Sequence, residues 1–131
     1  MPTIFTRIIN GELPGRFVYS DERTVAFLTI SPIRPGHTLV VPRVEVDHWI
    51  DLRDEAQCEL WTAAAKVGRA IQQAFQPRRV AALVAGLDVP HVHIHLIPIQ
   101  SEKQVDFALA DPDPSPADLD AAAERIRAAL G

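Results

Sequence analysis

Three of the five histidines in this chain, His91, His93 and His95, stand at every second position and are separated by aliphatic residues. Successive side chains of a β-strand point to opposite faces, so this spacing predicts a strand with imidazoles on one face and aliphatic groups on the other. A helix would scatter the same histidines around its circumference. We expect the strand to run from His91 to Ile97 and to stop at Pro98. Its imidazole face is the candidate active site.

Aligned imidazoles suit metal ligation, acid–base catalysis and nucleophilic attack. Alternate strand residues lie about 7 Å apart along the backbone, so the three side chains can converge on one small anion such as a phosphate. Each further protonation of neighbouring imidazoles costs more than the one before. At least one ring is therefore expected to be neutral at pH 7 and free to act as a nucleophile or a ligand. The residues alone leave a zinc site and a plain exposed strand face open as alternatives.

The elements that must position these histidines can be read from apolar periodicity and turn residues. Four further strands are predicted, at Phe17–Tyr19, Thr24–Leu28, His37–Val41 and, as a buried strand, Val80–Ala85. Helices are predicted at Thr3–Ile9 with Thr3 as cap, at Asp51–Phe75 with Asp51 and Asp54 at its start, and at Ser115–Leu130 with Ser115 as cap. Strands that come in hairpins favour an α+β fold with an antiparallel sheet.

Length and composition narrow the class of protein. The 131 residues, 47% of them hydrophobic, are enough for one compact domain spanning 1–131. A net charge of −4 with no basic cluster predicts neither nucleic acid nor a membrane as partner. The single cysteine, Cys58, is expected to be a small packing group, and Glu45 and Asp47 are expected to be solvated. The lone cysteine and the lack of a signal peptide favour a cytoplasmic protein.

The segment His91–Ile97 has the form His-φ-His-φ-His-φ-φ, where φ is apolar, and it resembles the motif of the histidine triad (HIT) nucleotide hydrolases and transferases. Three other segments resemble the same family in the same order: Ile4–Pro14, Ala26–Pro32 and Pro35–Pro42. The resemblance covers about residues 3–99, and the predicted helix over 115–130 lies beyond it.

The resemblance implies a five-stranded antiparallel sheet, a long central helix, and short N- and C-terminal helices, usually assembled as a homodimer. It implies a purine nucleotide substrate of phosphoramidate or dinucleotide type, cleaved at the α-phosphorus without a cofactor. His93 would be the nucleophile that forms a nucleotidyl-histidine. His91 and His95 would orient His93 and contact the phosphate, and His37 would be a fourth, supporting histidine. Some members carry a zinc-binding Cys-x-x-Cys where this chain has threonines, so no metal is expected.

The resemblance also implies a nucleotide-binding set, which comprises Phe5, Ile8, Phe27, Leu28, Thr29, Ile30, Gly86 and Asp88. Thr29 stands where relatives commonly carry an aspartate that holds the ribose hydroxyls. Leu87 cannot supply the hydrogen bonds of the glutamine found in relatives, and Asp88 brings a negative charge towards an anionic substrate. Two alternatives therefore stay open: a histidine-ligated metallohydrolase, and a nucleotide-binding module without turnover.

Overall fold

The computed structural model describes all residues, 1–131. The main elements in chain order are α1 (Ile4–Ile9), β1 (Phe17–Ser20), β2 (Thr24–Leu28), β3 (Thr38–Pro42), α2 (Asp54–Phe75), β4 (Arg79–Leu83), β5 (Ile94–Ile99) and α3 (Pro116–Leu130). Short 3₁₀ turns lie at Trp49–Asp51, Glu102–Gln104 and Phe107–Leu109.

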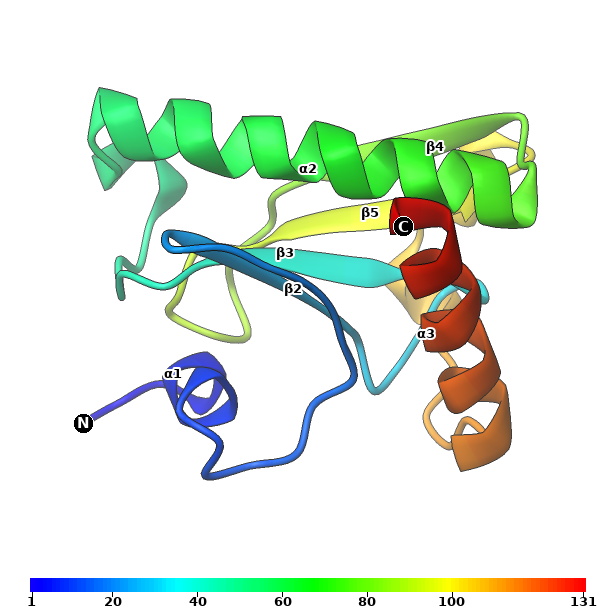
Figure 1. Ribbon diagram of the computed structural model, residues 1–131, viewed down its shortest axis with the longest axis horizontal. Coiled ribbons are helices and arrows are strands. Elements are labelled where there is room, and N and C mark those ends of the chain that lie inside the picture. Colours follow the sequence, from blue (N-terminus) through cyan, green and yellow to red (C-terminus); the bar gives the residue numbers. More distant parts are fainter.

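All five strands form one antiparallel sheet in the order β1-β2-β3-β5-β4. The long helix α2 crosses one face of the sheet, and the short helix α1 lies on the other (Figure 1). The α+β fold with a five-stranded antiparallel sheet is therefore confirmed.

Because successive side chains of a strand point to opposite faces, the side chains of the central strands pack alternately against the two layers. Ala26, Val40 and Ile94 face α2 and belong to the larger core, with the buried stripe of that helix. The stripe comprises Leu60, Ala63, Ala64, Val67, Ala70 and Ile71. Phe27 and Leu39 face the other way, towards Phe5 of α1. The side of the sheet that carries α1 is the side on which the histidines lie.

The start of α2 is later than predicted. Asp51 lies in a 3₁₀ turn, and the extended backbone of Leu52 separates that turn from the helix. The N-cap residue is Arg53, whose side chain makes no capping bond. Cys58 is exposed, because it lies off the buried stripe, so its predicted packing role was wrong. The helix ends where Gln76 adopts a left-handed conformation (φ 50°) ahead of Pro77.

Helix α3 begins as predicted, with the Ser115 hydroxyl accepting from the backbone N–H of Asp118. It begins on the side of α1, runs past the ends of the central strands and packs on α2 towards its C-terminal end (Figure 1). Near its end, Nε of Arg127 donates to the carbonyl of Phe17 in β1 at 2.7 Å. The helix therefore connects the two layers.

The histidine strand begins later than predicted, at Ile94, so the first two histidines of the motif precede it. Its last pair with β3 joins Val40 to Ile94. The ladder stops there because Pro42, at the end of β3, has no N–H to donate. The N–H of Val92 donates instead to the carbonyl of Val46 at 2.8 Å.

The end of the histidine strand also differs from the prediction, because β5 continues through Pro98 to Ile99. Beyond Leu96 its only paired neighbour is β4, and a strand flanked on one side tolerates a proline. The strand predicted as buried, β4, lies at the edge of the sheet and is half-exposed. None of the helices is long and apolar enough to cross a membrane.

Candidate active site

Four histidines, His37, His91, His93 and His95, meet on the face of the sheet that carries α1, and all four are buried. The ring centroids of His93 and His95 lie 4.9 Å apart, and those of His37 and His95 lie 5.2 Å apart. The edge of the Phe5 ring packs against His93 at 4.9 Å. The predicted convergence of the histidines is therefore present, although only His95 lies within a strand.

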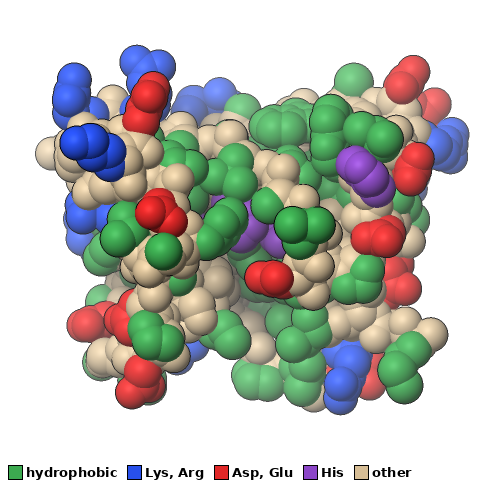
Figure 2. Space-filling view, turned by 180° about the vertical axis from the view of Figure 1, so that it is seen from behind, with side chains coloured by type: hydrophobic (Ala, Val, Ile, Leu, Met, Phe, Trp, Pro, Cys, Tyr) green, Lys and Arg blue, Asp and Glu red, His purple; other side chains and the backbone are tan.

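Two of these histidines, His93 and His95, line a cavity of about 700 Å³. Figure 2 shows histidine side chains at the back of a central hollow with a largely hydrophobic rim. The cavity is also lined by seven residues of the predicted nucleotide-binding set: Phe5, Ile8, Phe27, Leu28, Thr29, Ile30 and Asp88. Gly86, the eighth, lines a separate groove beside Trp49 and is not brought to the histidines.

His93 is held by a hydrogen bond that decides which of its nitrogens is basic. Its Nδ1 lies 2.7 Å from the backbone carbonyl oxygen of His91. A carbonyl only accepts, so Nδ1 carries the proton and donates. In the neutral ring, Nε2 then carries the free lone pair. No protein group is hydrogen-bonded to this nitrogen, which makes it the candidate nucleophile.

A chain of hydrogen bonds sets the tautomer of His95. The backbone N–H of Ile33 donates to Nδ1 of His37 at 3.0 Å, so the proton of that neutral ring is on Nε2. Nε2 of His37 donates in turn to Nδ1 of His95 at 2.9 Å. His95 is therefore protonated on Nε2, which makes its second nitrogen a donor available to a phosphoryl oxygen.

The turn before β3 places His37 at the start of this chain. Gly36 has φ +95°, a left-handed backbone conformation that residues with a Cβ rarely adopt. A Cβ at this position would also lie only 2.8 Å from the ring of Phe75 in α2. Glycine here therefore satisfies both the turn and the packing of the long helix.

Both ring nitrogens of His91 are hydrogen-bonded within the protein. Its Nε2 lies 2.8 Å from the carbonyl of Pro42 and must donate to it, so Nδ1 accepts from the hydroxyl of Thr3 at 2.7 Å. Because no ring nitrogen is left, a phosphate contact by His91 would require one of these bonds to break. The arrangement supports the orienting half of its predicted role, through the carbonyl that holds His93.

The same threonine ties the site to α1. The hydroxyl of Thr3 caps the helix by accepting from the N–H of Thr6 at 3.1 Å. Oε1 of Glu45 accepts from the N–H of Thr3 at 2.7 Å and from the hydroxyl of Thr6 at 2.6 Å. These bonds, the first of them above all, lower the pKa of Glu45. Glu45 is exposed, as predicted, and it also anchors α1 through these bonds.

Burial leaves the four rings neutral at pH 7. It lowers the pKa of His37 to about 3 and of His95 to about 4, with neighbouring histidines adding to both shifts. Burial also lowers the pKa of His91 and His93. A neutral His93 has its nucleophilic lone pair without the help of a separate base.

Sequence reasoning missed three residues around this cavity. Arg16 and Asp120 both line it, and Phe107 packs edge-on against His95 at 4.9 Å. Arg16 and Asp120 are 104 positions apart and have no shared motif, so only the path of α3 reveals that they meet. Phe107 lies in a 3₁₀ turn beyond the strand, where no periodicity pointed to it.

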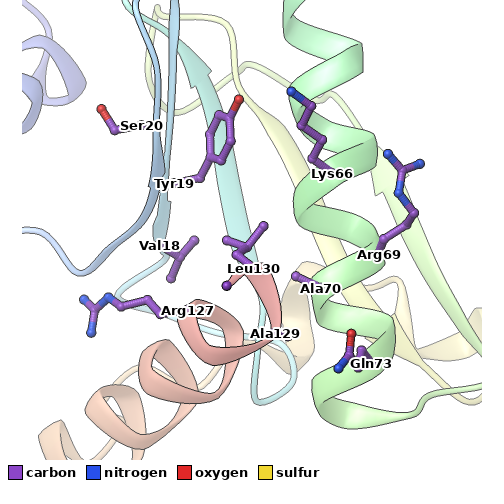
Figure 3. A pocket seen from close by; sticks show the side chains of 11 residues that line it. Val18, Tyr19, Ser20, Lys66, Arg69, Ala70, Gln73, Arg127, Ala129 and Leu130 are labelled. Atoms are coloured by element: carbon purple, nitrogen blue, oxygen red, sulfur yellow. The ribbon is translucent and has the colours of Figure 1, made fainter.

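A second hollow, on the side of α2, is lined by basic side chains that do not converge on one point. It lies between β1, α2 and the end of α3, and Lys66, Arg69 and Arg127 line it. Figure 3 shows that these three side chains point in different directions. No histidine reaches it, so the cavity of His93 and His95 is the candidate active site.

Known proteins resemble this chain in both sequence and fold. The family described as HIT domain matches residues 10–102. Protein hit of Bacillus subtilis is 39% identical over 95 residues, which cover 69% of this chain and 66% of that protein. The purine nucleoside phosphoramidase of Escherichia coli is 37% identical over 68 residues, which cover 50% of this chain and 57% of the enzyme.

Among solved structures, a Hit-like protein from Bartonella henselae, described as involved in cell-cycle regulation, superposes with a TM-score of 0.85 at 30% identity. The superposition covers 97% of this chain and 95% of the other. A family match over most of the chain, a shared fold and the clustered histidines of the motif lead to one conclusion. This chain belongs to the HIT domain family.

Proposed function

We propose that this protein hydrolyses a derivative of a purine nucleoside monophosphate at its α-phosphorus, through a nucleotidyl intermediate on His93. One observation carries the proposal: the carbonyl of His91 holds the Nδ1 proton of His93, which leaves a basic Nε2 at the cavity. The phosphoramidase activity in the name of the E. coli relative supports a phosphoramidate substrate, and a dinucleotide is the other candidate.

The reaction has two displacements. In the first, the Nε2 lone pair of His93 forms a bond to the α-phosphorus, and the bond to the leaving group breaks with its electron pair. The leaving amine or phosphate takes a proton from solvent. In the second, water supplies hydroxide to the phosphorus and a proton to solvent, while the P–N bond returns its electrons to Nε2. The products are a nucleoside monophosphate and the protonated leaving group.

The surrounding groups fit the charges that develop in these steps. The His93 ring becomes positive on attack, and the carbonyl of His91 already accepts its Nδ1–H. The Nε2–H of His95 is a donor for an oxygen of the phosphoryl group, where negative charge grows. Asp88 lines the cavity on the side of His93 and favours the positive form of that ring.

The apolar part of the cavity suits a purine base. Phe5 and Ile8 of α1 face Phe27 and Leu39 of the sheet, and Ile30 adds an exposed apolar group at the rim. Thr29 lies at the end of β2 in the same cavity and stays our candidate for a contact to the sugar. Gly86 is left out of the proposal, because it lines a different groove.

The metallohydrolase alternative conflicts with the hydrogen bonds of the rings. A histidine ligates a metal through a nitrogen lone pair, and a catalytic zinc takes three protein ligands. Here both nitrogens of His91 and one nitrogen each of His93 and His95 are bonded within the protein. Only Nε2 of His93 offers a lone pair to the cavity. Chelators are accordingly expected to leave activity unchanged.

The test compares the wild type with His93→Ala, using adenosine phosphoramidate and a dinucleotide as substrates and calorimetry with AMP for binding. We expect His93→Ala to lose turnover and to keep AMP binding, while His48→Ala, at an exposed histidine, keeps both. Turnover that survives in His93→Ala, or that disappears with chelator and returns with zinc, would contradict the covalent mechanism. A wild type that binds AMP but cleaves neither substrate would be a binding module.

The proposal includes a homodimer and a cytoplasmic location. The strand β4 leaves one backbone edge unpaired and half-exposed, where the chain Val80–Ala85 is apolar throughout. Such an edge can pair with a second copy of the chain. Sedimentation at micromolar concentration is expected to give twice the monomer mass of 14.4 kDa, and a monomer would remove this part of the proposal.

A further inference from the structure

The cavity has a second polar end, away from the histidines. Nε of Arg16 donates to Oδ1 of Asp120 at 2.7 Å, and both residues line the cavity. Arg16 lies just before β1, and Asp120 lies early in α3. The fold therefore brings a carboxylate from its last helix to the cavity lined by His93, the candidate nucleophile, which directly precedes β5.

The position of this pair follows from the strand register. The carbonyl of Arg16 accepts from the N–H of Leu28 at the end of β2. The preceding residue of β2, Phe27, is paired with Leu39, which is paired in turn with His95. Because β2 lies two strand spacings from β5 and Arg16 lies one spacing beyond β2, the backbone of Arg16 stands roughly 14 Å across the sheet from that of His95, and the Arg16 side chain lines the same cavity. To reach this pair, a nucleotide bound by its phosphate at His93 must extend its sugar across β3 and β2.

The chemistry at this end favours recognition of hydroxyl groups. Arg16 occupies Oδ1 of Asp120 and leaves Oδ2 without a protein partner. Thr29 is the other residue of the cavity that could contact the sugar, but its hydroxyl already accepts from the N–H of Ser31 at 3.2 Å. An ionised carboxylate also accepts more strongly than a hydroxyl does. Asp120 is thus the strongest free acceptor at the end of the cavity formed by β2.

We infer that Arg16 and Asp120 form a subsite for the vicinal hydroxyls of a ribose, with Asp120 accepting from the sugar and Arg16 holding the carboxylate in place. The inference rests on the proposed function, because it assumes that a nucleotide occupies the cavity. It assigns a role in substrate selection to α3, a helix that lies outside the match to the family. Ribonucleotides are then preferred over nucleotides that lack these hydroxyls.

The test measures binding of AMP and of its 2′,3′-dideoxy analogue to the full-length protein by calorimetry. The variants are Asp120→Asn and, as a matched control on the same helix, Asp118→Asn. Both aspartates are exposed, so both variants are expected to fold, and thermal melting checks this. One charge-assisted hydrogen bond from a ribose hydroxyl to Asp120 should make the wild type bind AMP roughly tenfold more tightly than the analogue, which lacks that hydroxyl. Asp120→Asn should lose most of this ratio through weaker AMP binding, and Asp118→Asn should keep it.

Two results would overturn the subsite. One is an unchanged ratio in Asp120→Asn, and the other is an equal loss of affinity for both nucleotides, which would indicate a general structural role. Either result leaves the proposed function standing, because the wild type still binds AMP. A wild type that binds neither nucleotide would instead contradict the proposed function, and the subsite with it.

Discussion

Loss of the hydrogen bond between His37 and His95 is expected to lower the stability of the protein by an amount that can be calculated. Replacing His37 by leucine keeps apolar volume but leaves two buried groups without partners, the N–H of Ile33 and Nδ1 of His95. Each orphaned group costs about 1–3 kcal/mol, so the variant is expected to lose about 2–6 kcal/mol of stability. For 131 residues this corresponds to a fall of roughly 7–20 °C in melting temperature.

The same change is expected to slow catalysis. Without His37 nothing fixes the proton of His95 on Nε2, and misalignment of one donor to a reacting oxygen lowers kcat by on the order of 10²-fold. Melting followed by circular dichroism and steady-state kinetics measure the two effects. His48→Leu is the matched control at an exposed histidine, and His37→Gln keeps an N–H donor and should recover part of both losses. Unchanged melting and kcat in His37→Leu would refute the proposed role of this chain of bonds.

Two further predictions concern pH and the anchoring of α1. Burial lowers the pKa of the four site histidines in the folded protein, to about 3 for His37 and about 4 for His95, whereas all four titrate near 6.5 in the unfolded chain. Between these values the unfolded chain binds more protons, so the free energy of unfolding should fall as pH drops from 6.5 towards 4; urea titrations that show no such fall would contradict it. Glu45→Ala removes the acceptor of two bonds from the start of α1, so amide hydrogen exchange over Ile4–Ile9 should become several-fold faster, whereas Asp47→Ala should not change it. Equal protection in the two variants would remove Glu45 from this role.

Much of the fold follows from local pattern. Apolar spacing predicted the long helix, and its stripe from Leu60 to Ile71 is buried as expected. The alternation of histidines predicted one shared face, and the rings do meet there. These features depend on residues close together in the chain, where the periods of helices and strands act directly.

The differences from the prediction come from tertiary neighbours. The histidine strand starts late because Pro42, which is 52 positions before Ile94 in the sequence, ends the ladder with β3. The strand β4 is half-exposed because the topology puts it at an edge, which its apolar sequence does not reveal. Glu45 anchors α1 only because the fold brings that helix beside it, and Asp120 lines the cavity only because α3 carries it to Arg16. No local signal marks such contacts.

The stereochemistry at phosphorus distinguishes a covalent histidine intermediate from direct attack by water. A substrate whose α-phosphorus is chiral, through one sulfur in place of an oxygen, is hydrolysed in ¹⁸O-labelled water, and the configuration of the product is determined by ³¹P NMR. Attack by Nε2 of His93 followed by attack of water inverts the phosphorus twice. Overall retention of configuration is therefore expected. Overall inversion would show that water attacks directly, and it would contradict the nucleotidyl-histidine mechanism.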